Sequence, residues 1–339
     1  MISNETLLWA VFGIFVSSML LLDLGVLNRK AHALSIKEAT IWSVVWIVSA
    51  LLFAGGIFLL ETKARALEFL AGYLIEKSLS ADNIFVFIMV FAYFDVSPMQ
   101  QPRVLKWGIL GAIVMRAVLI ATGVTLINQF HWMTYVFGVL LLMTVIKMML
   151  QGDEKFDPGK NWALQLLRRI IPVSKRYYDE HFFVRSDKGF FATPLLMVLV
   201  VIESSDLIFA LDSIPAILAV TTDPFIVYTS NIFAILGLRA LYFVLAGMVR
   251  VFEYLKPGII IILTFVGVKM LIVDVYRIPI GISLAVIGVV LAISIIASWI
   301  NLRRNGRRLR EEIKATEAMV SIKATESHAP HFFVDASKR

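Results

Sequence analysis

Two long stretches without a charged residue constrain this chain more than any other feature. Residues 39–60 and 278–302 are uncharged, and a helix needs only about 20 apolar residues to cross a bilayer. The whole chain of 339 residues is 59% hydrophobic and 17% charged, with a mean hydropathy of +0.82. Soluble domains are about 45–50% apolar and about 25% charged. These values exclude a water-soluble globular enzyme and predict a polytopic membrane protein.

The apolar segments predict an all-α membrane protein with about nine transmembrane helices and a charged tail. The helices are expected at 7–27, 40–60, 67–94, 104–127, 131–150, 192–220, 225–250, 257–275 and 279–300. Residues 1–302 form the transmembrane domain in this interpretation, and 303–339 form a disordered cytoplasmic tail. Between the fifth and sixth helices lies a basic cytoplasmic segment, 151–191, in which residues 162–171 predict a short amphipathic helix.

The distribution of Lys and Arg predicts the orientation of the chain. Basic residues gather in one alternate set of loops, at 28–38, 103–106, 151–191 and 250–256, and in the tail. The opposite set holds only Lys63, Arg65 and Arg277. Because cytoplasmic loops carry the excess of Lys and Arg, we expect the N-terminus outside and the C-terminus in the cytoplasm. The basic face should contact anionic lipid, and no nucleic-acid partner is expected.

A repeated pattern relates the third to the sixth helix. Ser80-Ala-Asp-Asn-Ile-Phe85 aligns with Ser204-Ser-Asp-Leu-Ile-Phe209, and the match continues through the pairs Arg116–Arg239 and Lys147–Lys269. The repeat units are therefore 67–150 and 192–275, each of three helices. Because three is an odd number, the two copies should cross the membrane in opposite directions. Inverted repeats of this kind are typical of transporters, with the substrate site near the midplane between the copies.

Five carboxylates fall within the third and sixth helices: Glu76, Asp82, Glu203, Asp206 and Asp212. Asp23 lies at the end of the first helix. A charged side chain at bilayer depth costs about 2.5–3.5 kcal/mol on insertion scales. Three cations, Lys77, Arg116 and Arg239, are available as partners. Pairing all three leaves two negative charges, which either a divalent cation or protonation would neutralise.

The chemistry of the neighbouring side chains narrows the choice of cation. The hydroxyls of Ser78, Ser80, Ser204 and Ser205 and the amide of Asn83 are hard oxygen ligands, and the chain contains no cysteine. This set suits manganese, magnesium or calcium rather than copper or structural zinc.

A structural interpretation stands beside each of these assignments. The acids can form a buried salt-bridge network, the arginines can be counter-ions, Asn83 can join two helices, and Asp23 can be solvated. Thr229, Ser230 and Asn231 either line a path or cap a helix.

Spacing shows that the five acids cannot share one face of straight helices. Glu203 and Asp206 are three residues apart and share a face, whereas Asp206 and Asp212 are six apart. Pro215 removes a backbone hydrogen bond to Leu211, so we expect the sixth helix to be broken there. Carbonyl oxygens freed by such a break serve as cation ligands in discontinuous transport helices.

At these residues the chain resembles the TerC family of integral membrane proteins. The segments Glu76-Lys-Ser-Leu-Ser-Ala-Asp-Asn83 and Glu203-Ser-Ser-Asp-Leu-Ile-Phe-Ala-Leu-Asp-Ser-Ile-Pro215 are similar to the two hallmark segments of that family. Residues 180–185, 219–243 and 268–280 are most similar to its alkali- and manganese-responsive Alx branch. The resemblance covers roughly 7–302. It implies manganese export across the inner membrane, with the five intramembrane acids as metal ligands. A tellurite phenotype would be indirect, because no thiol is present.

The hypothesis from the sequence is therefore secondary export of Mn²⁺ across a bacterial inner membrane, in exchange for protons. Mn²⁺ is the transported ion, no prosthetic group is expected, and the chain is not expected to be an enzyme. One alternative is an intramembrane aspartyl protease with Asp82 and Asp206 as its dyad, but their contexts lack the Tyr-Asp and Gly-x-Gly-Asp motifs. Others are a metal-binding scaffold or sensor that works with partner proteins, and a pathway for calcium or protons.

Overall fold

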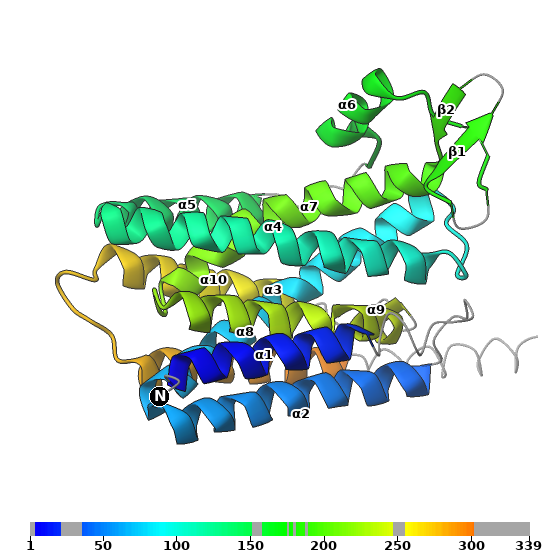
Figure 1. The fold of residues 1–339 in the computed structure, drawn as a ribbon. Coiled ribbons are helices and arrows are strands. Elements are labelled where there is room, and N and C mark those ends of the chain that lie inside the picture. Colours follow the sequence, from blue (N-terminus) through cyan, green and yellow to red (C-terminus); the bar gives the residue numbers. More distant parts are fainter. Residues whose placement is uncertain are drawn as a thin grey trace, which may run out of the picture.

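The protein is described by a computed structural model that covers residues 4–21, 36–150, 158–174, 176–178, 181–186, 189–246 and 255–301. Helices dominate, as expected, and lie side by side along one direction (Figure 1). The helices are α1 (Asn4–Leu21), α2 (Ile36–Leu60), α3 (Lys63–Tyr93), α4 (Gln101–Gln129), α5 (Met133–Leu150), α6 (Trp162–Ile170), α7 (Pro194–Leu218), α8 (Pro224–Leu236), α9 (Leu238–Ala246), α10 (Leu255–Leu271) and a last helix, Ile280–Asn301.

Six stretches of the described chain are helical, long and apolar enough to cross a membrane. They are Ile36–Leu60, Gln101–Gln129, Met133–Leu150, Pro194–Leu218, Pro224–Leu245 and Ile280–Asn301. Every one of the nine segments expected from the sequence contains a helix. The number of nine crossings itself remains a prediction, because α1, α3 and α10 do not meet the same criteria.

Apolar side chains on the outer helices face away from the bundle. Leu52 and Leu59 on α2 are 72% and 81% exposed, and Leu150 at the end of α5 is 80% exposed. Monomeric soluble proteins rarely expose contiguous apolar surface of this extent. Lipid around these helices removes the free-energy cost of exposing apolar side chains to water, so these helices form the outer surface of a membrane protein.

Helix α3 lies at the centre of the bundle. It begins after Thr62, whose side chain accepts a hydrogen bond from the backbone N–H of Arg65 at 3.2 Å. It packs against α2, α7, α8, α9 and α10, while α4 packs against α7 and α8, and α5 packs against α10. Most side chains of its central turns are therefore buried, including the charged group of Glu76.

Helices α5 and α10 approach each other at two glycines. A Cβ atom on Gly138 would lie 3.2 Å from the carbonyl oxygen of Gly267, so both positions need a small residue. Near the start of α5, His131 lies 3.1 Å from the carboxylate of Asp274, and the Tyr135 hydroxyl donates to the same carboxylate. These polar contacts tie the segment after α10 to α5.

The helix predicted at 225–250 is present as the helical stretch Pro224–Leu245, but the expectation that it is unbroken is wrong, because a turn at Gly237 separates α8, which ends at Leu236, from α9, which begins at Leu238. Gly237 lies at the junction, and a Cβ atom there would be 2.6 Å from Lys77 Nζ and 3.3 Å from Trp46 Cβ. The Lys77 ammonium donates to the carbonyl oxygen of Ala234 at 3.3 Å. It therefore neutralises the partial negative charge at the end of α8.

The predicted break at Pro215 is also wrong, because α7 continues from Pro194 to Leu218. The proline removes one hydrogen bond, but the helix ends one turn later, where Ala219 N–H bonds the Pro215 carbonyl at 3.0 Å. Only the last turn depends on the missing bond, so the helix survives it. Helix α3 is likewise continuous through Ser78 and Ser80.

The segment between α5 and α7 contains α6, where a short amphipathic helix was predicted, preceded by a 3₁₀ turn (Pro158–Lys160). It also contains an antiparallel hairpin of β1 (Phe183–Ser186) and β2 (Gly189–Ala192), which was not predicted. In its register Phe183 pairs with Ala192. Asp23 and the tail after residue 301 lie outside the described residues.

Candidate functional site

Arg116 is the centre of a buried polar network formed by four helices. Its side chain, from α4, is 1% exposed. On α7, Asp206 accepts hydrogen bonds from Arg116 Nη2 at 2.9 Å and from Nε at 3.3 Å. On α3, Glu76 accepts a hydrogen bond from Nη1. The planar guanidinium therefore binds two carboxylates from different helices at once.

Amide and hydroxyl groups complete the coordination of these charges. Asn231 on α8 donates to Glu76 Oε2 at 3.1 Å and accepts from Arg116 at 3.3 Å, and Ser213 on α7 lies 3.5 Å from Arg116 Nη1. Asn83 on α3 donates to Asp206 Oδ1 at 3.2 Å. Each carboxylate thus has both an arginine and an amide partner, as buried charges require.

Two oxygen atoms beside this network have no hydrogen-bond partner among the described residues. They are Ser80 Oγ and Asn83 Oδ1, on residues that are 1% and 2% exposed. Ser205, by contrast, donates to the Val201 carbonyl of its own helix at 2.8 Å. Buried polar atoms are rarely unsatisfied, and the cost rises where lipid excludes water. The two oxygens are three residues apart and so share a face of α3, and Asn83 contacts Asp206 through its amide. They are therefore available to a water molecule or a cation on this face of α3.

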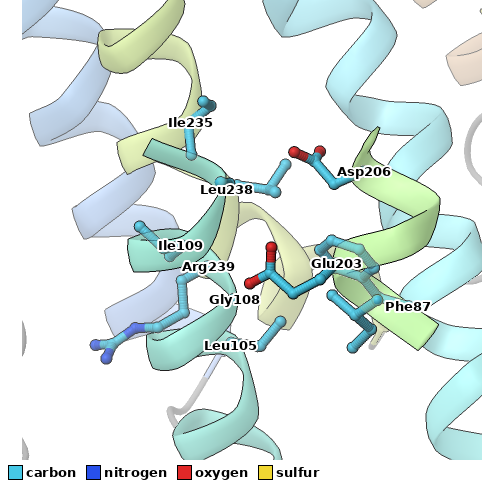
Figure 2. A pocket seen from close by; sticks show the side chains of 11 residues that line it. Phe87, Leu105, Gly108, Ile109, Glu203, Asp206, Ile235, Leu238 and Arg239 are labelled. Atoms are coloured by element: carbon cyan, nitrogen blue, oxygen red, sulfur yellow. The ribbon is translucent and has the colours of Figure 1, made fainter. Parts of the chain in front are cut away.

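Glu203 faces a small cavity next to the network (Figure 2). The cavity, about 20 Å³, has room for about one water molecule and also borders Asp206. A Cβ atom on Gly111 would clash with the Glu203 carboxylate, and one on Gly108 would lie 3.9 Å from it. The glycines therefore let this carboxylate lie against α4. It makes no hydrogen bond with any described residue.

The second arginine of the repeat pattern lies at the same cavity. Arg239 on α9 contributes to its wall, but its guanidinium points away from Glu203 (Figure 2). Arg239 is 4% exposed, so its charge is buried. It does not pair with Glu203 in this arrangement.

Asp212 and Ser204 contact residues outside the Arg116 network. Asp212 accepts a hydrogen bond from Thr144 on α5 at 2.8 Å. Ser204 exchanges hydrogen bonds with Asn161, the residue before α6, at 2.9 and 3.2 Å. The first contact points Asp212 towards α5, and the second ties α6 to the middle of α7.

The structure therefore brings together part of the predicted site. Glu76 and Asp206 share Arg116, with Asn83 and Ser80 beside them, and Glu203 lies on the neighbouring cavity. Asp212 lies with α5, and Lys77 lies at the end of α8. The side chain of Asp82, like Asp23, lies outside the described part of the chain.

Metal ligation by all five acids remains a prediction. Among the described residues, no three His, Cys, Asp or Glu side chains are close enough to hold a metal ion. The Arg116 guanidinium lies between Glu76 and Asp206 and binds both of them. In this arrangement one guanidinium is shared by two carboxylates, which leaves one negative charge in the network.

Several members of the site were not assigned from the sequence. Asn231, which the sequence left open between path and cap, bonds Glu76, while Asp223 caps α8. Ser213, Thr144 and Asn161 were not predicted. An isolated serine, threonine or asparagine carries no signal of its partner, because that partner comes from another helix. The spacing of Gly108 and Gly111 was the one available sign of close packing.

Comparison with known proteins adds a consistent set of relatives. The model of the integral membrane protein TerC family matches residues 61–306. An uncharacterized membrane protein of Myxococcus xanthus is 50% identical over 296 residues, which are 87% of this chain and 93% of that protein. Alx of Escherichia coli, named as a proposed membrane-bound redox modulator, is 49% identical over 312 residues (89% and 97%). A membrane protein of Rickettsia bellii is 40% identical over 292 residues (86% and 97%). No solved structure matches.

Proposed function

Because the chain belongs to the TerC family of integral membrane proteins, we propose that it is a secondary transporter that exports Mn²⁺ across the bacterial inner membrane in exchange for protons. The cation binds between α3 and α7. Asp206 is its carboxylate ligand, and the oxygens of Asn83 and Ser80 lie on the facing helix.

The observation that carries this proposal is the pair of unsatisfied oxygens on one face of α3, one of them on the residue that bonds Asp206. Ser80 Oγ and Asn83 Oδ1 are buried without a partner among the described residues, and Asn83 already contacts the Asp206 carboxylate through its other atom. Three oxygens of this kind are hard ligands, which suit Mn²⁺, Mg²⁺ and Ca²⁺. A cation bound there would coordinate the unsatisfied oxygens and compensate the buried negative charge, so it would remove both free-energy costs.

Arg116 gives the site two arrangements. In the structure its guanidinium holds both Asp206 and Glu76. A divalent cation at Asp206 repels this guanidinium, so Arg116 moves towards Glu76, which keeps its Asn231 amide. Cation and arginine therefore compete for one carboxylate, and metal binding can shift the equilibrium between the two arrangements of Arg116.

The packing of the helices supports an inverted repeat around this site. In the repeats predicted from the sequence, α3, α4 and α5 correspond to α7, α8 with α9, and α10. Under this correspondence, the contact between α3 and α8 is equivalent to the contact between α7 and α4, and both contacts are present. It also relates α5 to α10, which are in contact. The site then lies at the interface of the repeats, where transporters of this kind bind substrate.

The name of the Alx relatives, a proposed membrane-bound redox modulator, is compatible with metal export. This chain contains no cysteine, so it has no thiol to take part in redox exchange. A redox effect of this protein would follow from the Mn²⁺ level of the cell.

Mn²⁺ flux into proteoliposomes tests the function. The purified protein is reconstituted with a Mn²⁺-sensitive dye inside, and Asp206→Asn is compared with Asp274→Asn, the same change at a residue whose side chain is 46% exposed. We expect the parent and Asp274→Asn to agree within about twofold and Asp206→Asn to be slower by about tenfold or more, equivalent to about 1.4 kcal/mol. Parent-like flux through Asp206→Asn would overturn the site. Flux of Ca²⁺ or protons without Mn²⁺ would overturn the substrate, and no flux at all would favour the scaffold.

A further inference from the structure

Helix α6 is a short amphipathic helix between α5 and α7. It lies beside α7, outside the set of long parallel helices (Figure 1). Leu164 is fully buried and Leu167 packs against the same apolar core. One side of α6 is therefore part of the folded protein.

The adjacent side of α6 exposes large apolar side chains. Trp162, Leu166 and Ile170 are 56%, 50% and 68% exposed. They are spaced four residues apart, so they form one stripe along the helix. In a water-soluble setting this stripe would be costly, at about 25 cal/mol per Å² of apolar surface.

Positive charge borders this stripe. Arg168 and Arg169 occupy the last turn of α6 and are exposed, and residues 158–174 contain no Asp or Glu. The polar arc of the helix, which includes Gln165, lies next to the apolar stripe. An apolar stripe with tryptophan, flanked by arginine, is the arrangement of a helix that lies in the plane of a membrane interface.

The start of α6 is fixed by its N-cap residue, Asn161. Asn161 accepts hydrogen bonds from the backbone N–H groups of Ala163 and Leu164, and it also bonds Ser204 on α7. The helix is therefore held against a membrane-spanning helix with its stripe directed outward. An anionic lipid offers both an acyl chain for the apolar stripe and a negative headgroup for the arginines, whereas a protein partner would need its own complementary apolar and acidic patch.

We propose that the face of α6 formed by Trp162, Leu166 and Ile170 is a binding site for anionic lipid. The apolar stripe enters the acyl-chain boundary, and Arg168 and Arg169 bind the phosphate groups of phosphatidylglycerol or another anionic lipid. This site is independent of the transported ion, and its test does not require transport.

Site-specific quenching tests the contact. Because the chain has no cysteine, Leu166→Cys can be labelled alone with an environment-sensitive fluorophore in nanodiscs. A spin-labelled phospholipid, as phosphatidylglycerol or as phosphatidylcholine, serves as the quencher. Gln165→Cys is the matched control, since residue 165 lies one position away on the polar arc. Ile170→Cys is a second reporter if the first variant does not fold.

We expect the label at 166 to be quenched at least twice as strongly as the label at 165. We also expect it to prefer the anionic quencher by about fivefold or more, because an arginine at an anionic surface contributes about that factor. The double variant Arg168→Gln/Arg169→Gln should lower this preference to near one. Equal quenching at 165 and 166, or a label at 166 shielded from both lipids, would overturn the proposal. The second result would indicate that protein covers the face.

Discussion

Replacing Arg116 by glutamine should destabilise the protein more than any exposed charge change does. The substitution leaves the Glu76 and Asp206 carboxylates in a site where Glu76 is fully buried and Asp206 is 4% exposed. Removal of one partner from a buried ion pair costs about 3–5 kcal/mol. The amides of Asn231 and Asn83 remain and relieve part of this cost. We therefore expect a loss of about 3 kcal/mol in the free energy of unfolding.

A second substitution separates charge from packing. In Arg116→Gln/Asp206→Asn one uncompensated carboxylate is gone, so about 1–2 kcal/mol should return, in keeping with the cost of an unsatisfied charged hydrogen-bonding group. Arg168→Gln, on the exposed side of α6, should change stability by no more than about 0.5 kcal/mol.

The assay is reversible unfolding in mixed micelles with increasing dodecyl sulfate, followed by far-ultraviolet circular dichroism. The reasoning would be refuted if Arg116→Gln cost less than about 1 kcal/mol, the upper value for a surface ion pair. It would also be refuted if the double variant were no more stable than the single one, because the loss would then come from packing.

Three further outcomes follow from the structure. Gly111→Ala places a Cβ against the Glu203 carboxylate, the far end of a flexible side chain beside a cavity, so it should cost no more than about 1 kcal/mol in the same unfolding assay. Gly108→Ala, whose nearest neighbour would be at 3.6 Å, should be stabilising by up to about 1 kcal/mol, because alanine favours a helix over glycine by about that amount; equal effects of the two changes would contradict a close approach at Gly111. Asn161→Ala removes the cap of α6 and should cost about 0.5–2 kcal/mol and raise amide hydrogen exchange in α6, and unchanged exchange would contradict the role of the cap. Hydrogen bonds from a tyrosine hydroxyl and a histidine ring hold the pKa of Asp274 below its usual value. The contribution of Asp274 to stability is therefore present above about pH 4 and is lost as the pH falls through the lowered pKa. Asp274→Asn should remove this acid-dependent step from a plot of melting temperature against pH, and an unchanged plot would show that the contact is not formed.

Much of the helical fold could be predicted because apolar composition and span length are local properties. The short amphipathic helix expected at 162–171, for example, is present as α6, Trp162–Ile170. The junction at Gly237 was missed because its cause is not local. Trp46 on α2 and Lys77 on α3 approach the backbone there, and only the packed bundle brings them together.

The site was predicted in part for the same reason. A charge inside an apolar segment is visible in the sequence, so Glu76, Arg116 and Asp206 were identified as important. The sequence offered Arg116 as a counter-ion for the acids but did not say which acids it would bind. The choice between arginine and metal as the partner of Asp206 depends on the distance between α4 and α7, which is not a local property. The break expected at Pro215 did not occur because the proline lies in the last turn of the helix, which ends at Leu218, so the missing hydrogen bond does not interrupt a longer helix.

The cation site itself is tested most directly by equilibrium binding of Mn²⁺ to the purified protein, followed by electron paramagnetic resonance. The account predicts one site per chain that is weakened about tenfold or more by Asp206→Asn and more modestly by Ser80→Ala, and left unchanged by Asp274→Asn. Parent-like binding by Asp206→Asn, or no saturable binding by the parent, would contradict a cation site between α3 and α7.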